Sequence, residues 1–469
     1  MVDILQAIDD FLYVPILVLI LILGGLYFSI RTGFVQIRLL KESIKLIMEP
    51  PASKGENHVS SFQALMVSTA SRVGTGNIVG VSTAICVGGP GAVFWMWLIA
   101  IIGAASAFME STLAQIYKRK NPDGSAYGGP AYYIEKALHA PMASVIFCIF
   151  LIATYAFGFN LLCSYNLQST FAVYSFYNET TPYIVGAVIA LLTAYCLFGG
   201  ENRIIKMTSF IVPIMGVAYV IISLIVIIFN IGNIPAMFAE IFRDAFNFRA
   251  IFSGLTGSCM IYGIKRGLFS NEAGVGSAPN ASASADVTHP VKQGLVQTVS
   301  VYLDTIVLCT ASALMCLSTG IAHTPDVAGA PYVQNAISTV FGSIGPTFIT
   351  IAMLLFGFTT LLGNLYYVDN ALAYLNGKKV PSKKFMNYFY IVCVVVIFLG
   401  AIIPMDAAWA LADITMGGMT IINIPSCLLM SKTALAALKD YEVQKKAGGP
   451  IVFMGKNIGL DESTIDFWK

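Results

Sequence analysis

Met66-Val-Ser-Thr-Ala-Ser-Arg-Val-Gly-Thr-Gly-Asn-Ile-Val-Gly80 has apolar, helix-length flanks, but an arginine, two glycines and an asparagine at its centre. Glycine removes side-chain bulk and accepts non-helical backbone, so the segment predicts a membrane helix that is interrupted rather than continuous. An interruption at bilayer depth leaves backbone N–H and C=O groups without helical partners. These groups must then find partners in a cavity or a ligand.

The same pattern returns in the second half of the chain as Asn271-Glu-Ala-Gly-Val-Gly-Ser277. In both places a charged residue stands two positions before Gly-x-Gly, and a polar residue follows. One such pair is weakly informative, because glycine is frequent in membrane helices. Two pairs at matching places favour two discontinuous helices, with accidental glycine placement as the alternative.

The composition indicates a protein that needs lipid. The 469 residues are 57% hydrophobic and 11% charged, with a mean hydropathy of +0.76, whereas a soluble domain carries about 25% charged residues. A helix needs about 20 apolar residues to cross a bilayer, and the uncharged runs predict an all-α membrane protein with eleven spans. They lie near 11–30, 61–87, 91–117, 141–174, 183–199, 204–230, 250–285, 293–320, 344–375, 385–404 and 407–431.

The distribution of basic residues predicts the orientation. If the N-terminus is outside, most of the 27 Lys and Arg residues fall in inward loops and the tail, and the outward loops hold only Arg243 and Arg249. This asymmetry satisfies the positive-inside rule and places the C-terminus in the cytoplasm of a multi-pass cell-membrane protein. Residues 1–10 lack the basic region and cleavage site of a signal peptide, so span 11–30 is expected to stay. It is uniformly apolar and predicts a peripheral helix.

Spans 2–6 and 7–11 form two sets of five. An odd number of spans per set turns the second set upside down, which predicts an inverted repeat with one broken helix at the start of each half. The expected organisation is a first helix and cytoplasmic linker, two five-helix repeats and a cytoplasmic tail, over residues 1–60, 61–230, 231–432 and 433–469. A short amphipathic helix in the linker and a helix up to Ala447 in the tail are also expected.

Ionisable groups within spans are costly and are functional candidates by default. They are Arg72, Glu110, Lys265, Arg266, Glu272, Asp304, Asp369 and Asp413. The alternative for each is an ion pair that locks helices together. Arg72 and Glu272 could face one another between the repeats, Glu110 and Asp369 look structural, and Asp304 is the best candidate for a cation contact.

The two breaks supply the remaining groups of a site for a zwitterion. A half-helix that begins after Gly76 presents N–H groups to a carboxylate, and half-helices that end before Gly74 and Gly274 present carbonyls to a cation. Small residues would let the backbone reach the ligand; they are Gly74, Thr75, Gly76, Ser270 and Gly274.

Other polar and aromatic side chains are weaker candidates. Thr359 and Thr360 offer adjacent hydroxyls to a small cation, although membrane threonines often bond to their own or a neighbouring helix. Gln168 could contact substrate, and so could Asn160, Asn166 or Asn271, or they could hydrogen-bond between helices. Phe269 could close over a ligand or simply pack in the core.

Several functions lack their motifs. The chain has no phosphate-binding Gly-x-x-x-x-Gly-Lys-Ser/Thr sequence, no Gly-x-Ser-x-Gly elbow and no nucleophile–base set. The nine cysteines fall within spans and predict apolar packing rather than disulfides, and the four histidines lack metal-ligand spacing. We therefore expect transport driven by an ion gradient, with no organic cofactor and no nucleic-acid partner.

The run Lys265-Arg-Gly-Leu-Phe-Ser-Asn-Glu-Ala-Gly-Val-Gly-Ser-Ala-Pro-Asn280 and the segment Ser71–Gly80 closely resemble the alanine or glycine:cation symporter family, and the resemblance covers essentially the whole chain. The family is similar to the amino acid–polyamine–cation superfamily. The resemblance implies the leucine-transporter-like 5+5 inverted repeat, preceded by one extra N-terminal helix.

The resemblance also implies roles for particular residues. Gly74, Thr75 and Gly76 would hold the substrate carboxylate. The carbonyls of Ala70 and Val73 would meet Thr359 and Thr360 around a sodium ion, and Asn77 and Asp304 approximate a second cation site. Arg72 departs from the leucine-transporter pattern, where this place is small and apolar, and is expected to point into an ion pair.

The function expected from these observations is sodium-coupled symport of alanine or glycine by alternating access. Proton coupling of the same substrates, a cation channel and a membrane-embedded enzyme are the alternatives. A monomer is compatible with this mechanism, and the sequence does not set the oligomeric state.

Overall fold

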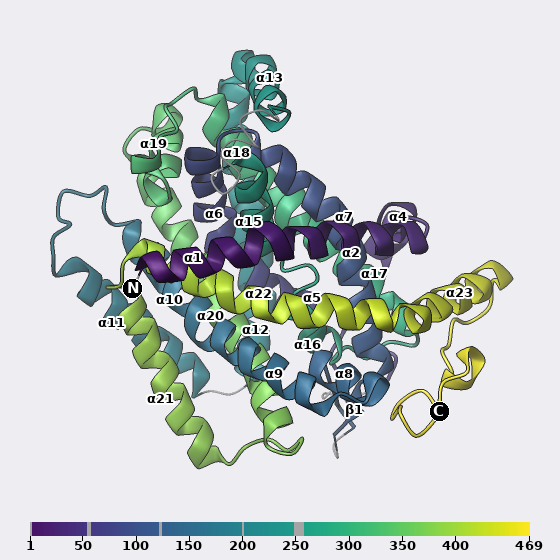
Figure 1. Cartoon of the computed structure of the whole chain (residues 1–469). Coiled ribbons are helices and arrows are strands. Elements are labelled where there is room, and N and C mark those ends of the chain that lie inside the picture. Colours follow the sequence, from purple (N-terminus) through teal and green to yellow (C-terminus); the bar gives the residue numbers. More distant parts are fainter. Residues whose placement is uncertain (1, 54–57, 122–123, 199–200, 248–257) are drawn as a thin grey trace.

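Apolar helices make up most of the chain in the computed structural model, which describes residues 2–53, 58–121, 124–198, 201–247 and 258–469 (Figure 1). Within these ranges, eight helical segments are long and apolar enough to cross a membrane. They are Val2–Arg31, Ala92–Ile116, Pro141–Ser169, Phe210–Phe229, Pro290–Ser318, Ile344–Leu375, Lys383–Gly400 and Met405–Leu429.

These segments correspond to the following elements. Three contain a π-helical turn: α1 (Val2–Leu12), η1 (Tyr13–Leu17) and α2 (Val18–Arg31); α9 (Pro141–Ile152), η4 (Ala153–Gly158) and α10 (Phe159–Ser169); and α17 (Pro290–Val301), η7 (Tyr302–Cys309) and α18 (Thr310–Ser318). The others are α7 (Ala92–Ile116), α12 (Glu201–Phe229), α20 (Ile344–Leu375), α21 (Lys383–Gly400) and α22 (Met405–Leu429).

The other three predicted spans differ from the eight for separate reasons. Span 61–87 is interrupted, and span 183–199 is the shorter apolar helix α11 (Thr181–Leu197) of 17 residues. Span 250–285 lies partly outside the described residues, and its described part is also broken. The count of eleven and the inverted repeat therefore stay predictions.

Short elements connect the long helices. They are α3 (Val35–Arg38), α4 (Leu40–Ile47), β1 (Arg119–Lys120), β2 (Ala126–Tyr127), α8 (Pro130–Leu138), η5 (Ile231–Asn233), α13 (Ile234–Ala245), η8 (Pro325–Val327), α19 (Ala330–Phe341), α23 (Ser431–Ala447) and η9 (Gly455–Ile458). The two strands pair as an antiparallel hairpin. Helix α4 is the short helix expected in the linker, and α23 is the helix expected in the tail. The sequence did not predict α13 and α19.

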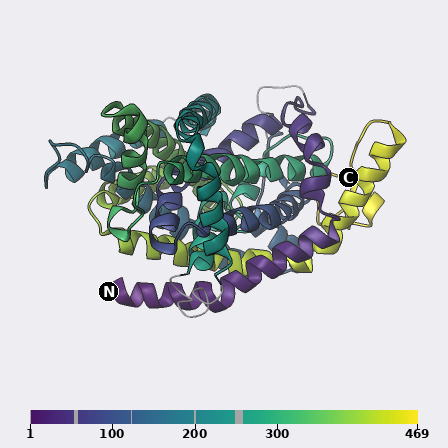
Figure 2. The same cartoon turned by 90° about the horizontal axis from the view of Figure 1, so that it is seen from above.

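The N-terminal helix begins earlier than predicted. It starts at Val2 rather than near residue 11, and it runs alongside α22 (Figures 1 and 2). Its first turns contain Asp9, which is buried and pairs with Lys265 at 2.7 Å. The predicted span 11–30 did not include these acidic turns, because the search for uncharged runs excluded them.

Helix α7 is packed closely by the helices beside it. A Cβ at Gly263 would lie 2.5 Å from the carbonyl oxygen of Ala92, and one at Gly294 would lie 2.1 Å from Thr112 Oγ1. Small residues of this kind let membrane helices approach backbone to backbone. The close packing fixes α7 against both the second broken helix and α17.

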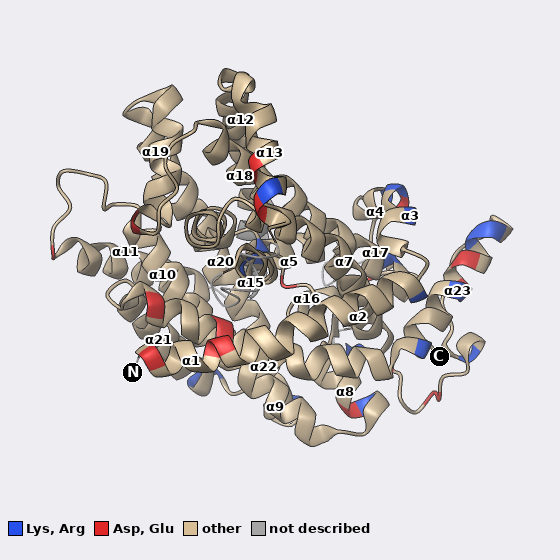
Figure 3. Ribbon diagram, turned by 45° about the horizontal axis from the view of Figure 1, so that its top comes forward, with Lys and Arg blue, Asp and Glu red and all other residues tan. Residues whose placement is uncertain are grey.

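Charge is unevenly distributed along the molecule. Lys and Arg gather on α3, α4 and α23 (Figure 3), at one end of the molecule. We call this the basic end.

The C-terminal tail folds back onto the basic end. Trp468 Nε1 donates a hydrogen bond to the carbonyl oxygen of Gln115 at 2.7 Å, and Lys118 Nζ lies 4.9 Å from the centre of the Trp468 ring. The backbone N–H of Phe453 donates to the carbonyl oxygen of Thr288 at 3.0 Å. The tail is therefore an integral layer of the fold.

His289 adds a second attachment for the tail. Its Nδ1 accepts a hydrogen bond from the backbone N–H of Val291, and its Nε2 lies 3.2 Å from Asp440 Oδ2. Burial lowers the pKa of His289 to about 4. Near neutral pH the ring is therefore uncharged and carries its hydrogen on Nε2, which donates a hydrogen bond to Asp440 Oδ2.

Replacement of Trp468 by alanine should release the tail without unfolding the bundle. Trp468 is only 7% exposed, and loss of a buried tryptophan side chain typically costs about 3 kcal/mol or more. Limited trypsin digestion followed by mass spectrometry should show faster cleavage at Lys456. Val452→Ala is the matched control, because Val452 is 51% exposed. Equal cleavage rates in the two variants would contradict the docking role of Trp468.

Candidate functional site

The first predicted interruption is confirmed at the centre of span 61–87. Helix α5 (Ser61–Arg72) ends before Gly74, a single 3-10 turn η2 (Thr75–Asn77) follows, and α6 (Val79–Thr83) and a π-helical turn η3 (Ala84–Gly88) continue the chain. The N–H of Gly74 donates to Asn77 Oδ1 at 2.8 Å. A side chain thus replaces the helical partner that this amide has lost.

The second interruption is also confirmed. Helix α15 (Cys259–Asn271) ends where Glu272, Gly274 and Gly276 adopt φ angles of 51°, 86° and 90°, and α16 (Ala278–Ser282) follows. Positive φ favours glycine. A Cβ at Gly276 would in addition lie 2.9 Å from the amide carbon of Asn423. The Gly-x-Gly pattern is therefore required by both conformation and space.

The two breaks contact each other. Asn77 Nδ2 donates to Ser270 Oγ at 3.0 Å. A Cβ at Gly76 would lie 3.0 Å from ring atoms of Phe269, so the aromatic ring rests directly on the first break. The structure thus brings the predicted residues of the two half-chains into one place.

Asp304 is the centre of a buried polar cluster between the breaks. Its carboxylate accepts hydrogen bonds from Asn77 Nδ2 at 2.7 Å, Ser270 Oγ at 2.7 Å and Thr305 Oγ1 at 2.8 Å. Asn271 Nδ2 donates to Thr305 Oγ1 at 3.2 Å. Asp304 is fully buried on the π-helical turn η7. The carboxylate is thus satisfied by N–H and O–H donors, and Asn77 Oδ1 is occupied by the Gly74 amide, so a cation bound here would have to displace some of these hydrogen bonds.

The predicted sodium residues are only partly brought together. A Cβ at Gly74 would lie 2.1 Å from Thr360 Oγ1, and one at Gly363 would lie 3.3 Å from the carbonyl carbon of Ala70, so α20 touches the end of α5. Val73 lies in the break itself. Both hydroxyls donate to carbonyl oxygens of their own helix, Thr360 to Phe356 at 2.9 Å and Thr359 to Phe356 at 3.0 Å. Thr359 Oγ1 also lies 3.8 Å from Met215 Sδ on α12, away from the first break.

Two polar residues on α10 have different surroundings. Asn166 Nδ2 donates to Thr75 Oγ1 at 3.1 Å and so reaches the first break. Gln168 Oε1 accepts a hydrogen bond from the Tyr177 hydroxyl at 3.2 Å, in the segment after α10. Residues two positions apart project about 200° apart around a helix, so one of the two faces the break and the other does not.

Arg72 is buried at the end of α5. Its Nη1 lies 3.3 Å from Gln297 Oε1, while Nε and Nη2 have no hydrogen-bond partner among the described residues. The charge of Arg72 acts on the carboxylates of Glu110 and Glu272. No salt bridge within 4 Å joins Arg72 to either acid in the described part of the chain, so the expected direct pair with Glu272 is absent there.

The two acids cap the second break. Glu272 accepts from Ser277 Oγ at 2.6 Å and from Ser71 Oγ at 3.1 Å. Glu110 accepts from the N–H of Gly274 at 3.3 Å and from Asn423 Nδ2 at 2.7 Å. Glu110 is thus part of the candidate site, although its place near the end of an apolar span suggested a purely structural role.

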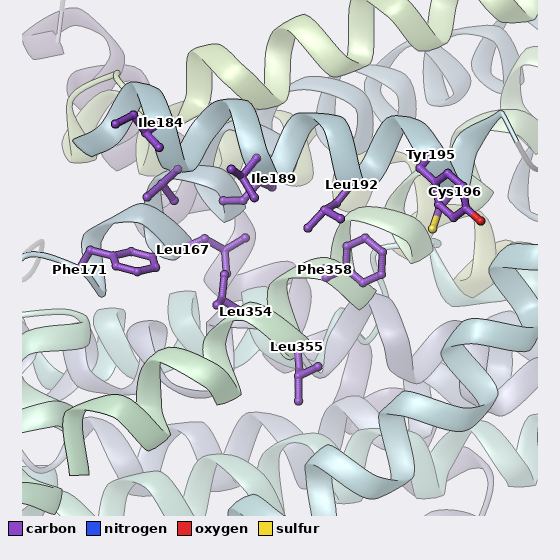
Figure 4. A pocket seen from close by; sticks show the side chains of 12 residues that line it. Leu167, Phe171, Ile184, Ile189, Leu192, Tyr195, Cys196, Leu354, Leu355 and Phe358 are labelled. Carbon is purple, nitrogen blue, oxygen red and sulfur yellow. The ribbon is translucent and has the colours of Figure 1, made fainter. Parts of the chain in front are cut away.

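A cavity of about 550 Å³ lies away from these groups, between α10, α11 and α20 (Figure 4). It is lined by Leu167, Phe171, Ile184, Val185, Val188, Ile189, Leu192, Tyr195, Cys196, Leu354, Leu355 and Phe358. Several of these side chains, such as Ile184 and Leu192, are exposed. This groove is apolar and faces outward, so it offers no partner for the charged ends of an amino acid.

The candidate site therefore consists of the two breaks and the polar side chains around them. Its groups can bind and orient a small zwitterion and a cation. Among the described residues no group of three or more His, Cys, Asp and Glu side chains could hold a metal ion, and the nine cysteines are buried and free of disulfides.

Comparison with known proteins gives the family. The sequence profile of the sodium:alanine symporter family matches residues 1–454. The chain is 42% identical over 486 residues to the putative sodium/proton-dependent alanine carrier protein YrbD of Bacillus subtilis, with 100% of this chain and 98% of that protein covered. It is 41% identical to the probable sodium/glutamine symporter GlnT of the same organism (98% and 94% covered). It is 36% identical to the sodium/alanine symporter AgcS of Methanococcus maripaludis (95% and 98% covered).

A solved structure supports the fold. The crystal structure of MhsT in complex with L-phenylalanine matches with a TM-score of 0.58 at 15% identity, covering 82% of this chain and 93% of that chain. At this identity the likeness bears on the fold alone, which is of the leucine-transporter-like kind expected from the sequence. The chain belongs to the sodium:alanine symporter family, and it is a multi-pass membrane transporter of amino acids rather than an enzyme.

Proposed function

We propose that this transporter couples the inward flow of sodium to the uptake of alanine or glycine. The observation that carries the proposal is the contact between two interrupted helices, through Asn77 and Ser270 and through Gly76 and Phe269. Interrupted membrane helices leave backbone groups to meet ions and the charged ends of a substrate.

The substrate site is formed by the backbone of Gly74, Thr75, Gly76 and Gly274, with side chains from the second break. Phe269 forms one wall, since its ring lies 4.6 Å from the Phe159 ring and 4.8 Å from the Trp409 ring, centre to centre. A wall held between two other aromatic rings leaves little room for a large side chain. This arrangement supports a small neutral amino acid as substrate.

Ser270 and Asn271 are expected on the substrate side of the second break. Asn166, which bonds Thr75, is a better candidate for a substrate contact than Gln168, whose amide oxygen bonds Tyr177. We therefore assign Asn166 to the substrate site and give Gln168 a supporting position outside it.

Two cation sites are proposed beside the substrate. The carbonyl groups of Ala70 and Val73 with Thr360 would hold sodium; Thr359 would join them only after its side chain turns away from α12. Asn77, Ser270 and Asp304 would form the second site, in which a cation would replace the hydrogen bonds that Asn77 Nδ2 and Ser270 Oγ now donate to the carboxylate. Sodium is a co-transported ion here, and no organic cofactor is needed.

Alternating access follows if each cation binds one conformation better than the other, because a ligand can shift an equilibrium only through such a difference. We propose that one five-helix repeat moves against the other around the fixed site. The basic end, with the C-terminal tail, would face the cytoplasm, and the N-terminus would lie outside.

Proton coupling is the second candidate. The name of the relative YrbD describes sodium/proton dependence. In this chain the carboxylates of Glu110 and Glu272 lie buried at the second break, and either could carry a proton in place of a cation.

Labelled alanine should exchange across proteoliposome membranes that contain the purified protein, and the exchange should require sodium. Counterflow with and without sodium measures this directly. Exchange driven equally well by a proton gradient alone would favour the second candidate. Ionic current without amino acid exchange would instead indicate a channel and contradict symport.

Thr360→Ala should raise the sodium concentration for half-maximal alanine uptake about tenfold, which corresponds to the loss of about 1.4 kcal/mol from one oxygen ligand. Thr359→Ala is the matched control and should have a smaller effect, because the Thr359 side chain faces Met215 on α12 whereas that of Thr360 lies against Gly74. Uptake measured against sodium concentration tests both variants. An unchanged half-saturation in Thr360→Ala would exclude this threonine from the sodium site.

Gly74→Ala should abolish most sodium-dependent uptake, because the new Cβ would lie 2.1 Å from Thr360 Oγ1. The break or α20 must then shift, and displaced ligands lose the geometry that binding requires. Gly216→Ala is the control, since nothing lies within 4 Å of the place that its new Cβ would occupy on α12. Normal uptake per folded molecule in Gly74→Ala would contradict the assignment of this break to the site.

A further inference from the structure

A buried group of four charges joins three helices that are distant in sequence. Lys265 Nζ on α15 lies 2.7 Å from Asp9 Oδ2 on α1, and Arg266 Nη2 lies 2.6 Å from Asp413 Oδ2 on α22. All four side chains are at most 5% exposed. We call Asp9, Lys265, Arg266 and Asp413 the charge cluster. Consecutive residues project about 100° apart on a helix, which is how α15 pairs with two different helices.

The charge cluster connects to the candidate site through stacked rings. The Arg266 guanidinium lies 3.7 Å from the centre of the Trp409 ring. Trp409 meets Phe269 edge to face at 4.8 Å, and Phe269 rests on Gly76. Cation–π contacts are worth about 2 kcal/mol or more when desolvated. Arg266 therefore fixes Trp409, and Trp409 fixes the wall over the first break.

The extra helix α1 is packed closely enough to transmit a change. A Cβ at Gly417, one turn beyond Asp413 on α22, would lie 2.5 Å from Leu12 Cδ2 and 2.8 Å from Leu17 Cδ1. The charges of Asp413 and Arg266 both act on Asp9. The two ion pairs of the charge cluster therefore interact with each other, and their two positive and two negative charges balance. The partly exposed Asp10 adds a further negative charge 3.5 Å from Lys265.

Many buried atoms in and around the charge cluster lack hydrogen-bond partners among the described residues. In the charge cluster they are Asp9 Oδ1, Arg266 Nε and Nη1, and Asp413 Oδ1. The rings stacked on the cluster add Trp409 Nε1 and the hydroxyl of Tyr13, whose ring centre lies 4.8 Å from Lys265 Nζ. Buried polar atoms are normally paired, and each exception calls for an explanation. The charge cluster is therefore held by charge and ring stacking, and some of its donors and acceptors have no hydrogen-bond partner among the described residues. Its ion pairs can for this reason be exchanged. We expect a Lys265 that has lost Asp9 to compete with Arg266 for Asp413.

We infer that Asp9 is a positioning residue of the transport site, which acts through Lys265, Arg266 and Trp409 on Phe269. This inference rests on the proposed function and deepens it. Asp9 pairs with Lys265, so Asp413 stays paired with Arg266. Arg266 then holds Trp409, and Trp409 holds Phe269 in place over the substrate. The extra N-terminal helix therefore takes part in substrate binding without touching the substrate.

The test is the alanine concentration for half-maximal uptake, measured at saturating sodium in proteoliposomes. Asp9→Asn should raise it about tenfold, as expected for loss of a hydrogen bond to a buried charge, with a smaller change in maximal rate. The paired variant Asp9→Asn with Lys265→Gln should return the value to within about twofold of the natural protein, because the competing charge is gone. Asp3→Asn, near the exposed start of the same helix, is the matched control.

Each outcome is decisive. Sodium-dependent uptake by the natural protein tests the proposed function, whereas the ratio between variants tests the role of Asp9. A normal half-saturation in Asp9→Asn would overturn the inference and leave α1 a structural helix. If Asp9→Asn does not fold, the paired variant remains testable, since it buries no unpaired charge. A second reference is the double variant Lys265→Gln with Trp409→Ala, which removes the ring that supports Phe269. If the paired variant needs as much alanine for half-maximal uptake as this reference does, the inference is also overturned.

Discussion

Backbone hydrogen bonding that stops in the middle of a membrane is the constraint on which this structure depends. Water cannot satisfy the exposed amides there, so side chains must do so. Asn77 accepts from the amide of Gly74, Asn271 accepts from the amide of Ala273, and Glu110 accepts from the amide of Gly274. The polar residues that appear scattered along apolar helices are in part the caps of two broken helices.

The same constraint explains why buried charges gather around the two breaks. Capping a break with carboxylates brings negative charge into the bilayer, and cations must accompany it. Arg72 supplies one fixed positive charge near Glu110 and Glu272. Asp304 has hydrogen-bond donors around it instead. The buried carboxylates are therefore balanced in two ways, by a fixed guanidinium and by hydrogen-bond donors.

The sequence predicted what depends on local pattern. Span 344–375 coincides with α20, and both breaks occur at the predicted glycines. It could not predict which of two polar neighbours faces inward: Asn166 reaches Thr75 whereas Gln168 bonds Tyr177. That choice depends on helix rotation, which is set by packing against distant segments. The sequence also could not reveal the partners of Asp9 and Glu110, because these come from α15 and from the second break.

The docking of Trp468 against Gln115 joins residues 353 positions apart in the chain. Closing a chain loop of this length costs conformational entropy, and the contact repays that cost only once it has formed. The tail therefore docks late in folding, on a surface that the helices of the bundle must assemble first.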